Sequence, residues 1–534
     1  MKPATSVLFA LVATLSAFLN VGSSQTVTTV LDNGPSDNRV DLIFIGDGYQ
    51  SNEIDGTYAG HVQDEIDYLF NGAFRNPFPR YQNFFNAHRV NVVSNESGAD
   101  QPPNGIFRDT ALDASYWWGG SVERCLYLNT SKANQAVNAA LAGSDIDIDA
   151  RFGLVNDDKY GGCGGSWAVY AAGNAAATDI GVHELGHSLG NLADEYWTNG
   201  TTYNSSEPNS VNLTTRPTTG KWDRWVGYDD PDTNIGPIGY YEGGGYHQLG
   251  LFRPSINSEM RNLNRPFDAI SREQFISRFY AEVDPLDDWL PNRTGIENPQ
   301  EIWVETIDPG VINVEWFVNG VSIGNQGETL DIPSLNLEPG QHSIEARAYD
   351  AILDHSFTGD SLDWWRRDDT SALEQFVAWD IDINNVGDFD NDGSYTCSDI
   401  DRLTLQIQLQ ADFSFDMNGD GLLNNDDIDA WLDTAGAREL TSGNPFLRGD
   451  ANLDGFVDAS DFNIWNQNSF TENPFWCSGN FNADFFVDAS DFNIWNGNSF
   501  TRSDHNLTVV PEPGGLFLIV AAGVAFLNFR RRSI

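Results

Sequence analysis

Apolar and polar residues follow strand-like and helix-like patterns by turns in the first half of the chain. The apolar run VDLIFIG at 40–46 predicts a strand, and turn residues after it lead to a predicted helix at 51–70. RVNVVS at 89–94 predicts another strand, and a glycine-rich stretch at 160–173 leads into a helix that contains the sequence HELGH. This mixture of elements predicts an α/β (α+β) domain over residues 25–284.

Between residues 285 and 383 the pattern changes to an alternation of apolar and polar positions. INVEWFVNGVSIG places two strand-like runs on either side of Asn319-Gly320, a pair that favours a tight hairpin turn. HSIEARAYD at 342–350 predicts a further strand. We therefore expect a small immunoglobulin-like β-sandwich that serves as a packing domain, with a carbohydrate-binding or peptide-binding face as the alternative.

The third part of the chain, residues 384–505, repeats itself at a spacing of about thirty residues. Each repeat opens with a loop rich in Asp, Asn and Gly. Carboxylate and amide oxygens at loop positions 1, 3, 5 and 12, with Gly at position 6, are the pattern of a calcium-binding loop. The predicted calcium ligands are Asp388, Asp390, Asp392 and Asp399 in the first loop, Asp416, Asn418, Asp420 and Asp427 in the second, and Asp450, Asn452, Asp454 and Asp461 in the third.

These loops differ from a standard EF-hand, which has Glu at position 12. The shorter Asp at that position resembles dockerin-type calcium loops, and the resemblance implies α-helical repeats and a cohesin-like docking partner. The fourth loop starts with Asn480 and has Phe485 in place of the turn Gly, so we expect strained backbone there and weak binding or none. The repeated sequence DFNIWN favours packing between repeats over a partner surface, because its Phe and Trp would otherwise be exposed.

Charge narrows the range of partners. The chain of 534 residues has 29 Lys plus Arg against 77 Asp plus Glu, a formal net charge of -48. Such a charge repels nucleic acid, so we expect no nucleic-acid partner. The acidic residues gather in the repeats, where they fit a hard cation better than a solvated surface.

Both ends of the chain carry targeting patterns. Lys2, an apolar run at 7–21 and the small residues that follow match a secretory signal peptide over residues 1–24. At 509–534, Pro-Glu-Pro, an apolar stretch and an Arg cluster resemble a PEP-CTERM sorting signal. The resemblance implies export in a bacterial envelope, a tail that enters the membrane before processing, and a cell-surface or secreted product. A permanent transmembrane anchor is the competing interpretation.

Four cysteines in an exported chain predict disulfides. The pairs that keep the predicted domains separate are Cys125 with Cys163 and Cys397 with Cys477. The sequence leaves the other pairings open.

The sequence HELGHSLGNLADEY at 183–196 carries the candidate chemistry. His183 and His187 lie one helical turn apart, as two imidazoles must to bind one zinc ion, and Glu184 is the predicted general base. The usual position of a third ligand holds Ala193, which cannot bind metal.

We expect a left-handed turn at Gly190 to bring the chain back under the metal. That return offers Asp194 as the third ligand, with Glu195 as the alternate and a remote residue as the last option. The acid that is not the ligand would hydrogen-bond to a ligating histidine.

Four stretches together resemble the IgA-peptidase-type family of metzincin-like zinc metallopeptidases. They are IGDGY at 45–49, YGGCGG at 160–165, HELGHSLGNLADEY, and EGGGYHQLGLFRPSINSEMR at 242–261, and WWRRDD at 364–369 is a candidate continuation. The resemblance implies a zinc metalloendopeptidase with a methionine turn beneath the metal at Met260. An ordinary core methionine is the alternative. Tyr246 and His247 are treated as structural, with cleft lining or oxyanion stabilisation as their alternative roles.

These patterns predict an exported zinc endopeptidase that hydrolyses peptide bonds of a protein or peptide substrate. Zinc would be the catalytic cofactor and calcium a structural one. The rival hypothesis is a catalytically inactive surface adhesion or docking protein, which the intact His183, Glu184 and His187 disfavour.

Overall fold

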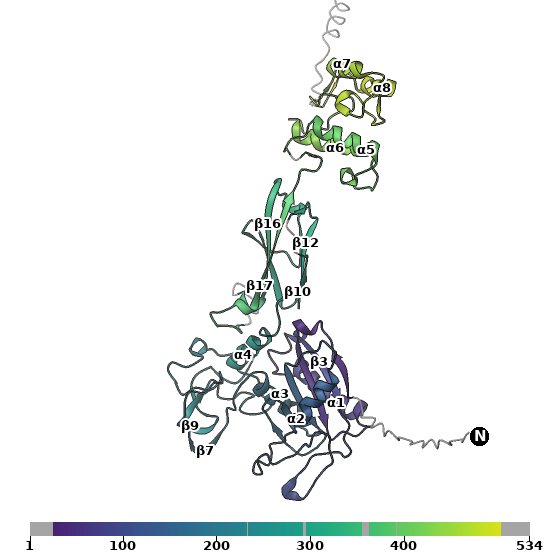
Figure 1. Cartoon of the computed structure of the whole chain (residues 1–534). Coiled ribbons are helices and arrows are strands. Elements are labelled where there is room, and N and C mark those ends of the chain that lie inside the picture. Colours follow the sequence, from purple (N-terminus) through teal and green to yellow (C-terminus); the bar gives the residue numbers. More distant parts are fainter. Residues whose placement is uncertain (1–24, 232, 292–294, 355–362, 391, 504–534) are drawn as a thin grey trace, which may run out of the picture. The chain divides into compact units, whose positions relative to one another are not determined.

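The computed structural model is a mixed α/β structure with eight α-helices among its described residues (Figure 1). Those residues are 25–231, 233–291, 295–354, 363–390 and 392–503. The predicted signal peptide and sorting tail lie outside them. Within the described parts of the chain, no helix is long and apolar enough to cross a membrane.

The chain separates into two compact units. Unit 1 comprises Met1–Arg293, Gln300–Ser334 and Ser343–Trp379. Unit 2 comprises Thr294–Pro299, Leu335–His342 and Asp380–Ile534.

A six-stranded sheet forms the centre of the N-terminal part of unit 1, in the order β1-β3-β2-β4-β6-β5. Strands β3, β2, β4 and β6 run parallel, and β1 and β5 pair antiparallel at the two edges. The bounds are β1 Thr26–Leu31, β2 Val40–Asp47, β3 Phe85–Asn91, β4 Ala150–Val155, β5 Gly162–Cys163 and β6 Ala168–Ala171.

Two local predictions for this sheet need adjustment. The strand predicted at 40–46 is confirmed as β2, but the one predicted at 89–94 begins and ends earlier, because β3 pairs from Phe85 with the start of β2. The helix predicted at 51–70 is shorter. It consists of α1 at Ala59–Asn71, preceded by a wider π-helical turn in which the N–H of Tyr58 donates to the carbonyl oxygen of Glu53 at 2.9 Å.

Helices cover both faces of the sheet. Alternate residues of β2, Ile43 and Ile45, pack into a buried cluster with α2, Thr130–Ala140. On the other face Phe44 stacks on Phe152, with ring centroids 4.6 Å apart, and α3, Ala177–Ser188, lies against β4, β5 and β6. Helix α1 packs on α3, so the helix that holds HELGH is enclosed between the sheet and a second helix.

The rest of the predicted peptidase region forms a small sheet and one helix. Strand β9 lies between β7, which runs parallel to it, and β8, which runs antiparallel. The elements are β7 Trp197–Thr202, β8 Tyr241–Gly244, β9 Tyr246–Arg253 and α4 Ala269–Phe279.

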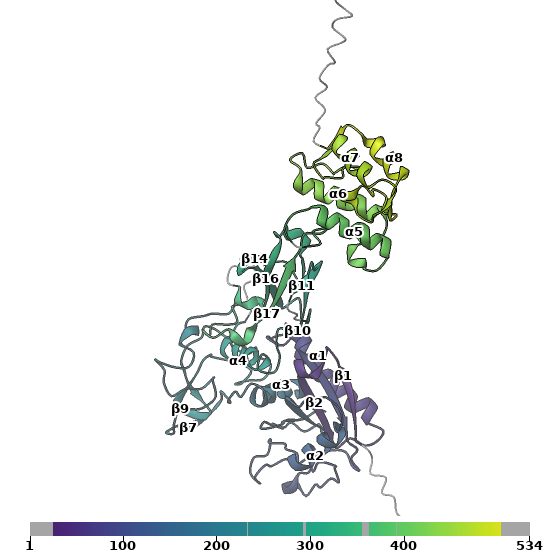
Figure 2. The same cartoon turned by 45° about the horizontal axis from the view of Figure 1, so that its top comes forward.

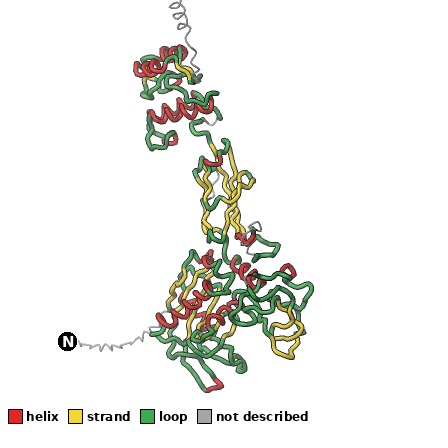
Figure 3. Tube along the Cα trace, turned by 180° about the vertical axis from the view of Figure 1, so that it is seen from behind, coloured by secondary structure: helices red, strands yellow, loops and turns green. Residues whose placement is uncertain are grey.

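Residues 286–383 form two further sheets, drawn as yellow strands in Figure 3. The predicted hairpin is confirmed: Asn319 and Gly320, between β13 and β14, have φ values of 50° and 76°. Trp316 and Trp379 stack in the interior, with ring centroids 5.9 Å apart. One sheet consists of β10 Leu286–Trp289, β12 Glu301–Thr306 and β15 Thr329–Asp331, and the other includes β13 Ile312–Val318, β14 Val321–Asn325, β16 Gly340–Asp350 and β17 Glu374–Ile383. In unit 2, β11, Ile296–Glu297, pairs in parallel with Ile381 and Asp382 at the end of β17.

A buried polar junction joins these strands to the N-terminal part of unit 1. Asp350, at the end of β16, is fully buried and accepts hydrogen bonds from Arg80 Nη2 at 2.9 Å, Tyr81 OH at 2.6 Å and Tyr280 OH at 2.8 Å. Within WWRRDD, the N–H of Arg366 donates to Glu273 of α4 at 2.9 Å. Both contacts join sequence regions that hydrophobic patterning alone assigns to different domains.

Unit 2 contains the repeats as helix pairs (Figure 2). Their buried apolar side chains form one core. Its helices are α5 Cys397–Leu409, α6 Asn425–Glu439, α7 Ala459–Asn468 and α8 Ala489–Asn498, and its short strands are β18 Phe456–Val457, β19 Thr471–Glu472, β20 Phe486–Val487 and β21 Thr501–Arg502.

The last two repeats exchange equivalent contacts. Trp465 Nε1 donates to the carbonyl oxygen of Asp488, and Trp495 Nε1 donates to that of Asp458, both at 2.9 Å. Both indoles are nearly buried, and Phe462 packs on Trp495 with ring centroids 5.1 Å apart. The expectation that DFNIWN serves packing between repeats is confirmed for these residues.

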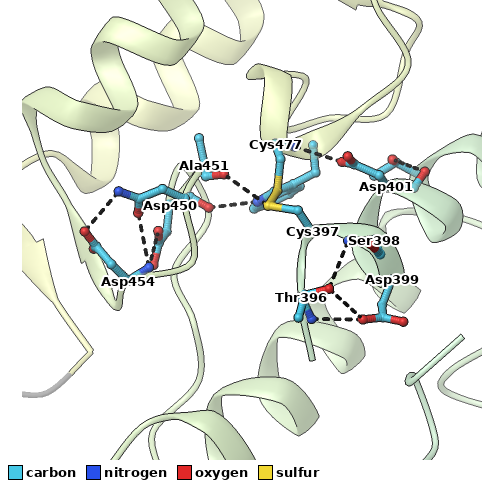
Figure 4. The surroundings of a disulfide bond; sticks show 12 residues. Thr396, Cys397, Ser398, Asp399, Asp401, Asp450, Ala451, Asp454 and Cys477 are labelled. Atoms are coloured by element: carbon cyan, nitrogen blue, oxygen red, sulfur yellow. Dashed lines mark hydrogen bonds between the residues drawn. A yellow bond between two sulfur atoms is a disulfide. The ribbon is translucent and has the colours of Figure 1, made fainter. Parts of the chain in front are cut away.

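Two disulfides are present, Cys125–Cys163 in unit 1 and Cys397–Cys477 in unit 2. They are the pairs expected from the separation of the predicted domains. Figure 4 shows the second bond, beside which Asp401 accepts the N–H of Cys477 at 2.9 Å.

Candidate active site

Helix α3 places the residues of HELGH at the floor of a cleft. His183 and Glu184 are buried although they are polar, and His187 is half-buried. The next apolar residues of the helix, Ile180 and Leu185, are buried as well, so the helix is fixed on nearly all sides. Polar side chains held in this way need defined partners.

Each imidazole has one nitrogen bound to a backbone carbonyl. His183 Nδ1 donates to the carbonyl oxygen of Glu259 at 2.9 Å, and His187 Nδ1 donates to that of Leu192 at 2.8 Å. A carbonyl can only accept, so both rings carry their proton on Nδ1 when they are neutral. The two Nε2 lone pairs are therefore available to one common ligand.

Asp194 lies where the two Nε2 atoms converge. Its Oδ1 atom is 3.1 Å from His183 Nε2 and 3.4 Å from His187 Nε2. Ligand atoms of these three residues all lie within 4.8 Å of one another. Two imidazoles and one carboxylate at this spacing have the donor set of a catalytic zinc site.

The pKa values in this cluster are strongly coupled. Burial acts to lower the pKa of His183, but the hydrogen bond to Asp194 and the nearby carboxylate charges raise it to about 9. Burial acts to raise the pKa of Asp194, yet its bonds to both imidazoles hold that pKa well below its usual range. These shifts favour a protonated His183 beside an ionised Asp194, and a cation bound by these residues would compete with that proton.

The chain returns to the imidazoles by a turn at Asn191 rather than at Gly190. Asn191 has a φ of 52°, and the N–H of Leu192 donates to the carbonyl oxygen of Gly186, six positions earlier in the chain, at 3.0 Å. The prediction of a left-handed Gly190 is wrong. A Cβ at Gly190 would lie 2.7 Å from the Gly186 oxygen, so glycine is needed there for close packing.

Glu195, the alternate third ligand, lies outside the group of side chains that could share one metal ion. It is fully buried, and its carboxylate accepts Ser258 Oγ at 2.6 Å and Asn212 Nδ2 at 3.1 Å. Burial, followed by the charge of Asp268, raises the pKa of Glu195 to about 8. The expectation that the remaining acid bonds to a ligating histidine is wrong, because Glu195 instead fixes the turn beneath them.

Met260 lies under α3 between the two histidines. A Cβ at Gly186 would be 2.4 Å from Met260 Sδ, so the thioether rests directly on the helix. The Met260 carbonyl oxygen also accepts the N–H of Glu195 at 2.8 Å. Met260 is fully buried, and its role as a methionine turn stays a prediction.

Glu184 points its carboxylate into the cleft. Among the described residues its Oε2 atom is buried without a hydrogen-bond partner, and burial raises the pKa of this acid. A Cβ at Gly164 would lie 2.5 Å from that oxygen and 2.8 Å from His187 Cδ2. The glycine-rich stretch therefore covers Glu184 closely, and an unpaired buried carboxylate oxygen beside the imidazoles fits a base that acts on metal-bound water.

The cleft in front of these residues has a volume of about 750 Å³. Tyr246 lines it and donates from its hydroxyl to Asp194 Oδ2, so the cleft-lining role is the one found. Arg124 also lines it and donates to Tyr196 OH at 3.2 Å. His247 does not line it, since its Nδ1 bonds to the carbonyl oxygen of Gly245 at 2.6 Å.

The three complete calcium-type loops share one internal arrangement. In each, the N–H of the position 6 glycine donates to the position 1 aspartate, at 2.8 Å in the first loop, 2.7 Å in the second and 2.8 Å in the third. In the first loop the carboxylates of Asp388, Asp390 and Asp392 lie close enough to hold one cation. The structure does not bring Asp399 into that group: its carboxylate accepts backbone N–H groups of Phe389 and Thr396.

The same capping role is found at position 12 of the other loops. Asp427 accepts the N–H of Asn424, and Asp461 accepts that of Asp458, both at 2.8 Å. Each caps the helix that follows its loop. The side chains at positions 1, 3 and 5 converge in the first loop, while the carboxylate at position 12 is held by backbone N–H groups in all three loops.

The fourth loop keeps the fold of the others at a conformational cost. Phe485 has a φ of 75°, close to the 79° of Gly455 at the same place in the third loop. Asn480 directs its Nδ2 atom to the carbonyl oxygen of Asn473 at 2.8 Å. The expected strain is confirmed, because a side chain occupies the left-handed region.

Sequence reasoning missed several residues that fix this site. The side chain of Asn212 accepts the N–H of Ala193 at Oδ1 (2.9 Å) and donates from Nδ2 to the carbonyl oxygen of Ala193 (2.8 Å). Arg75 is fully buried against Glu259 at 3.3 Å. Neither residue belongs to a local sequence motif. For the site as a whole, the glycines of YGGCGG were the one sequence signal that the backbone approaches the active-site residues closely.

Residues 28–235 match the family model described as IgA Peptidase M64. The matched region contains all of HELGHSLGNLADEY and ends before Met260. No curated protein matches the chain. The match supports a peptidase, and hence a hydrolase of the metallopeptidase type that acts on a protein or peptide.

Proposed function

We propose that this chain is an exported zinc endopeptidase. The observation that carries the proposal is the convergence of His183 Nε2, His187 Nε2 and Asp194 Oδ1, with both imidazoles fixed from behind by carbonyl groups. Two neutral imidazoles and one carboxylate suit zinc and leave a coordination position for water. The Glu184 oxygen beside them that has no hydrogen-bond partner among the described residues is consistent with a water at that position.

Zinc at these residues would supply Lewis acidity, lowering the pKa of a water and polarising the substrate carbonyl. Glu184 would accept a proton from the attacking water at its carboxylate and would return it to the leaving amine. Gly164 lets the glycine-rich stretch approach this carboxylate closely, because a Cβ there would lie 2.5 Å from its Oε2 atom. Tyr246, whose hydroxyl donates to Asp194, orients this carboxylate from the cleft side.

The expected substrate is an extended protein or peptide. The cleft is lined by backbone of the glycine-rich stretch and by Tyr196, Tyr246 and Arg124, a surface that accepts a peptide main chain. The family name does not determine the substrate, and cleavage of immunoglobulin is no part of this proposal.

The test is hydrolysis of casein or gelatin by the full chain, with metal content measured in parallel. Removal of metal by a chelator should abolish hydrolysis, and one equivalent of zinc should restore it. Hydrolysis that survives in metal-free protein would contradict the proposal, and so would zinc-loaded protein that cleaves neither substrate.

We also propose that calcium stabilises unit 2. Burial and the charge of Asp461 raise the pKa of Asp450 to about 7, which reflects carboxylates crowded around one space. A cation bound by positions 1, 3 and 5 would relieve that crowding. The fourth loop, with Asn480 and Phe485, is the one expected to bind weakly or not at all.

A second candidate function is docking of a cohesin-like partner by the repeats, which is compatible with catalysis. It is favoured by Phe470 and Phe500, which occupy equivalent positions and are 78% and 71% exposed. Export to the bacterial cell surface or medium, with the C-terminal tail in the membrane before processing, remains part of the proposal. Cell fractionation with and without the tail would test it.

A further inference from the structure

A second cavity, of about 450 Å³, adjoins the cleft that holds His187 and Glu184. The two cavities share part of their walls. The shared residues are Trp118, Cys163, Gly164 and Gly165. We call the second one the side cavity.

The wall of the side cavity is more apolar than polar, with no charged side chain and with the hydroxyl groups of Tyr127, Thr130 and Ser166 among its polar groups. Leu128, Trp167 and Val169 line it and belong to the buried cluster that fills one face of the central sheet. Trp118 is 59% exposed and forms part of the wall common to both cavities. Exposed apolar surface of this kind beside a polar cleft indicates a binding surface.

Gly164 and Gly165 add no side chain to the boundary between the two cavities, which Trp118 and Cys163 also form. Gly164 lies against Glu184, since a Cβ there would be 2.5 Å from its Oε2 atom. A Cβ at Gly165 would meet no atom within 4 Å. A substrate bound in the cleft beside Gly164 therefore lies next to both the side cavity and Glu184, the group assigned as general base.

We propose that the side cavity binds a bulky apolar side chain, aromatic or branched aliphatic, at a fixed position close to the cleaved bond of the substrate. The proposal rests on the peptidase function proposed above. Cys163 lines both cavities, and its disulfide to Cys125 ties this wall to a second segment of the chain. Transfer of such a side chain from water into an apolar pocket favours binding in proportion to the area buried.

The test compares two peptides that differ in one side chain. Both are twelve residues of Gly, Ser and Ala, and one carries a single Phe where the other has Ala. Their binding to the zinc-loaded Glu184→Gln protein is measured by calorimetry, so that hydrolysis does not interfere. Ser166→Phe obstructs the side cavity from an exposed position that does not line the main cleft. Ser205→Phe is the matched control, because Ser205 is exposed and lines neither cavity.

The Phe peptide should bind at least about tenfold more tightly than the Ala peptide. Ser166→Phe should reduce this preference to less than about threefold, and Ser205→Phe should preserve it. Equal affinities, absence of binding, or a preference that survives Ser166→Phe would overturn the proposal. A binding preference without casein hydrolysis by the unsubstituted protein would overturn the peptidase function alone, and hydrolysis without a preference would overturn the side cavity alone.

Discussion

His183 Nδ1 donates a hydrogen bond to the backbone carbonyl oxygen of Glu259 at 2.9 Å. The side chain of Glu259 is in turn held by Arg75 Nη1 at 3.3 Å and by the N–H of Arg265 at 2.9 Å. Both Arg75 and Glu259 are fully buried. The orientation of the imidazole therefore depends on an ion pair far from it in sequence.

Substitution Arg75→Met should destabilise unit 1 by about 3–5 kcal/mol, because it leaves the buried Glu259 carboxylate without its partner. Urea unfolding measures the loss. The control is the double variant Arg75→Met with Glu259→Gln, which removes both charges and should recover part of the stability. If the single and double variants unfold alike, the ion pair does not support the turn beneath His183.

Asp194 and Glu195 should respond differently to replacement by alanine. Asp194→Ala should lower zinc occupancy sharply with little change in folding, since it removes a direct ligand. Glu195→Ala should mainly reduce stability, because it leaves Ser258 and Asn212 without their shared acceptor. Metal analysis and thermal melting of both variants measure these effects. The reverse pattern would make Glu195 the ligand.

The local patterns of the sequence predict much of the fold. Strand β2, the hairpin at Asn319-Gly320 and both disulfides follow from runs, turn residues and domain separation. The left-handed residue was placed one position early, because glycine was assumed to be there for its φ. The structure uses it for contact with the Gly186 oxygen.

Long-range contacts could not be predicted in this way. Asn212 reaches Ala193 across nineteen residues of chain, and Asp350 collects three donors from the N-terminal part of unit 1. Such contacts depend on tertiary packing, which the hydrophobic periodicity of the sequence does not predict. The grouping of residues 300–334 and 343–379 with the N-terminal residues in unit 1 depends on such contacts as well.

Asp149→Asn should make unit 1 more stable at alkaline pH. Burial, together with the charges of Glu282, Asp41 and Asp147, raises the pKa of Asp149 to about 6 from the ordinary value of 3.8. A raised carboxyl pKa contributes stability below the unfolded pKa, and this contribution is lost as the pH rises through the folded value. The melting temperature of the variant should equal that of the natural protein near pH 4 and exceed it near pH 8. A difference in melting temperature between the two proteins that does not change between pH 4 and pH 8 would contradict the assignment.

Calcium should raise the melting temperature of unit 2. At a free calcium concentration a hundred times the dissociation constant, each site adds about 2.7 kcal/mol to the free energy of unfolding. Loops three and four provide a matched pair, since both continue with DASDFNIWN. After chelator treatment, calorimetry should find about three ions. Asp454→Asn should remove one of them, whereas Asp484→Asn in the fourth loop should remove none. If the number of bound calcium ions falls in both variants, or in neither, the difference between Gly455 and Phe485 does not decide which loop binds calcium.

The central claim is that Glu184 acts as the base beside a zinc ion held by His183, His187 and Asp194. The most direct measurement is the casein-hydrolysis rate of Glu184→Gln together with its zinc content. The variant should retain about one zinc per chain, because the ligands remain, and its rate should fall by at least about a hundredfold. A variant that keeps both its zinc and a rate near that of the natural protein would contradict the account.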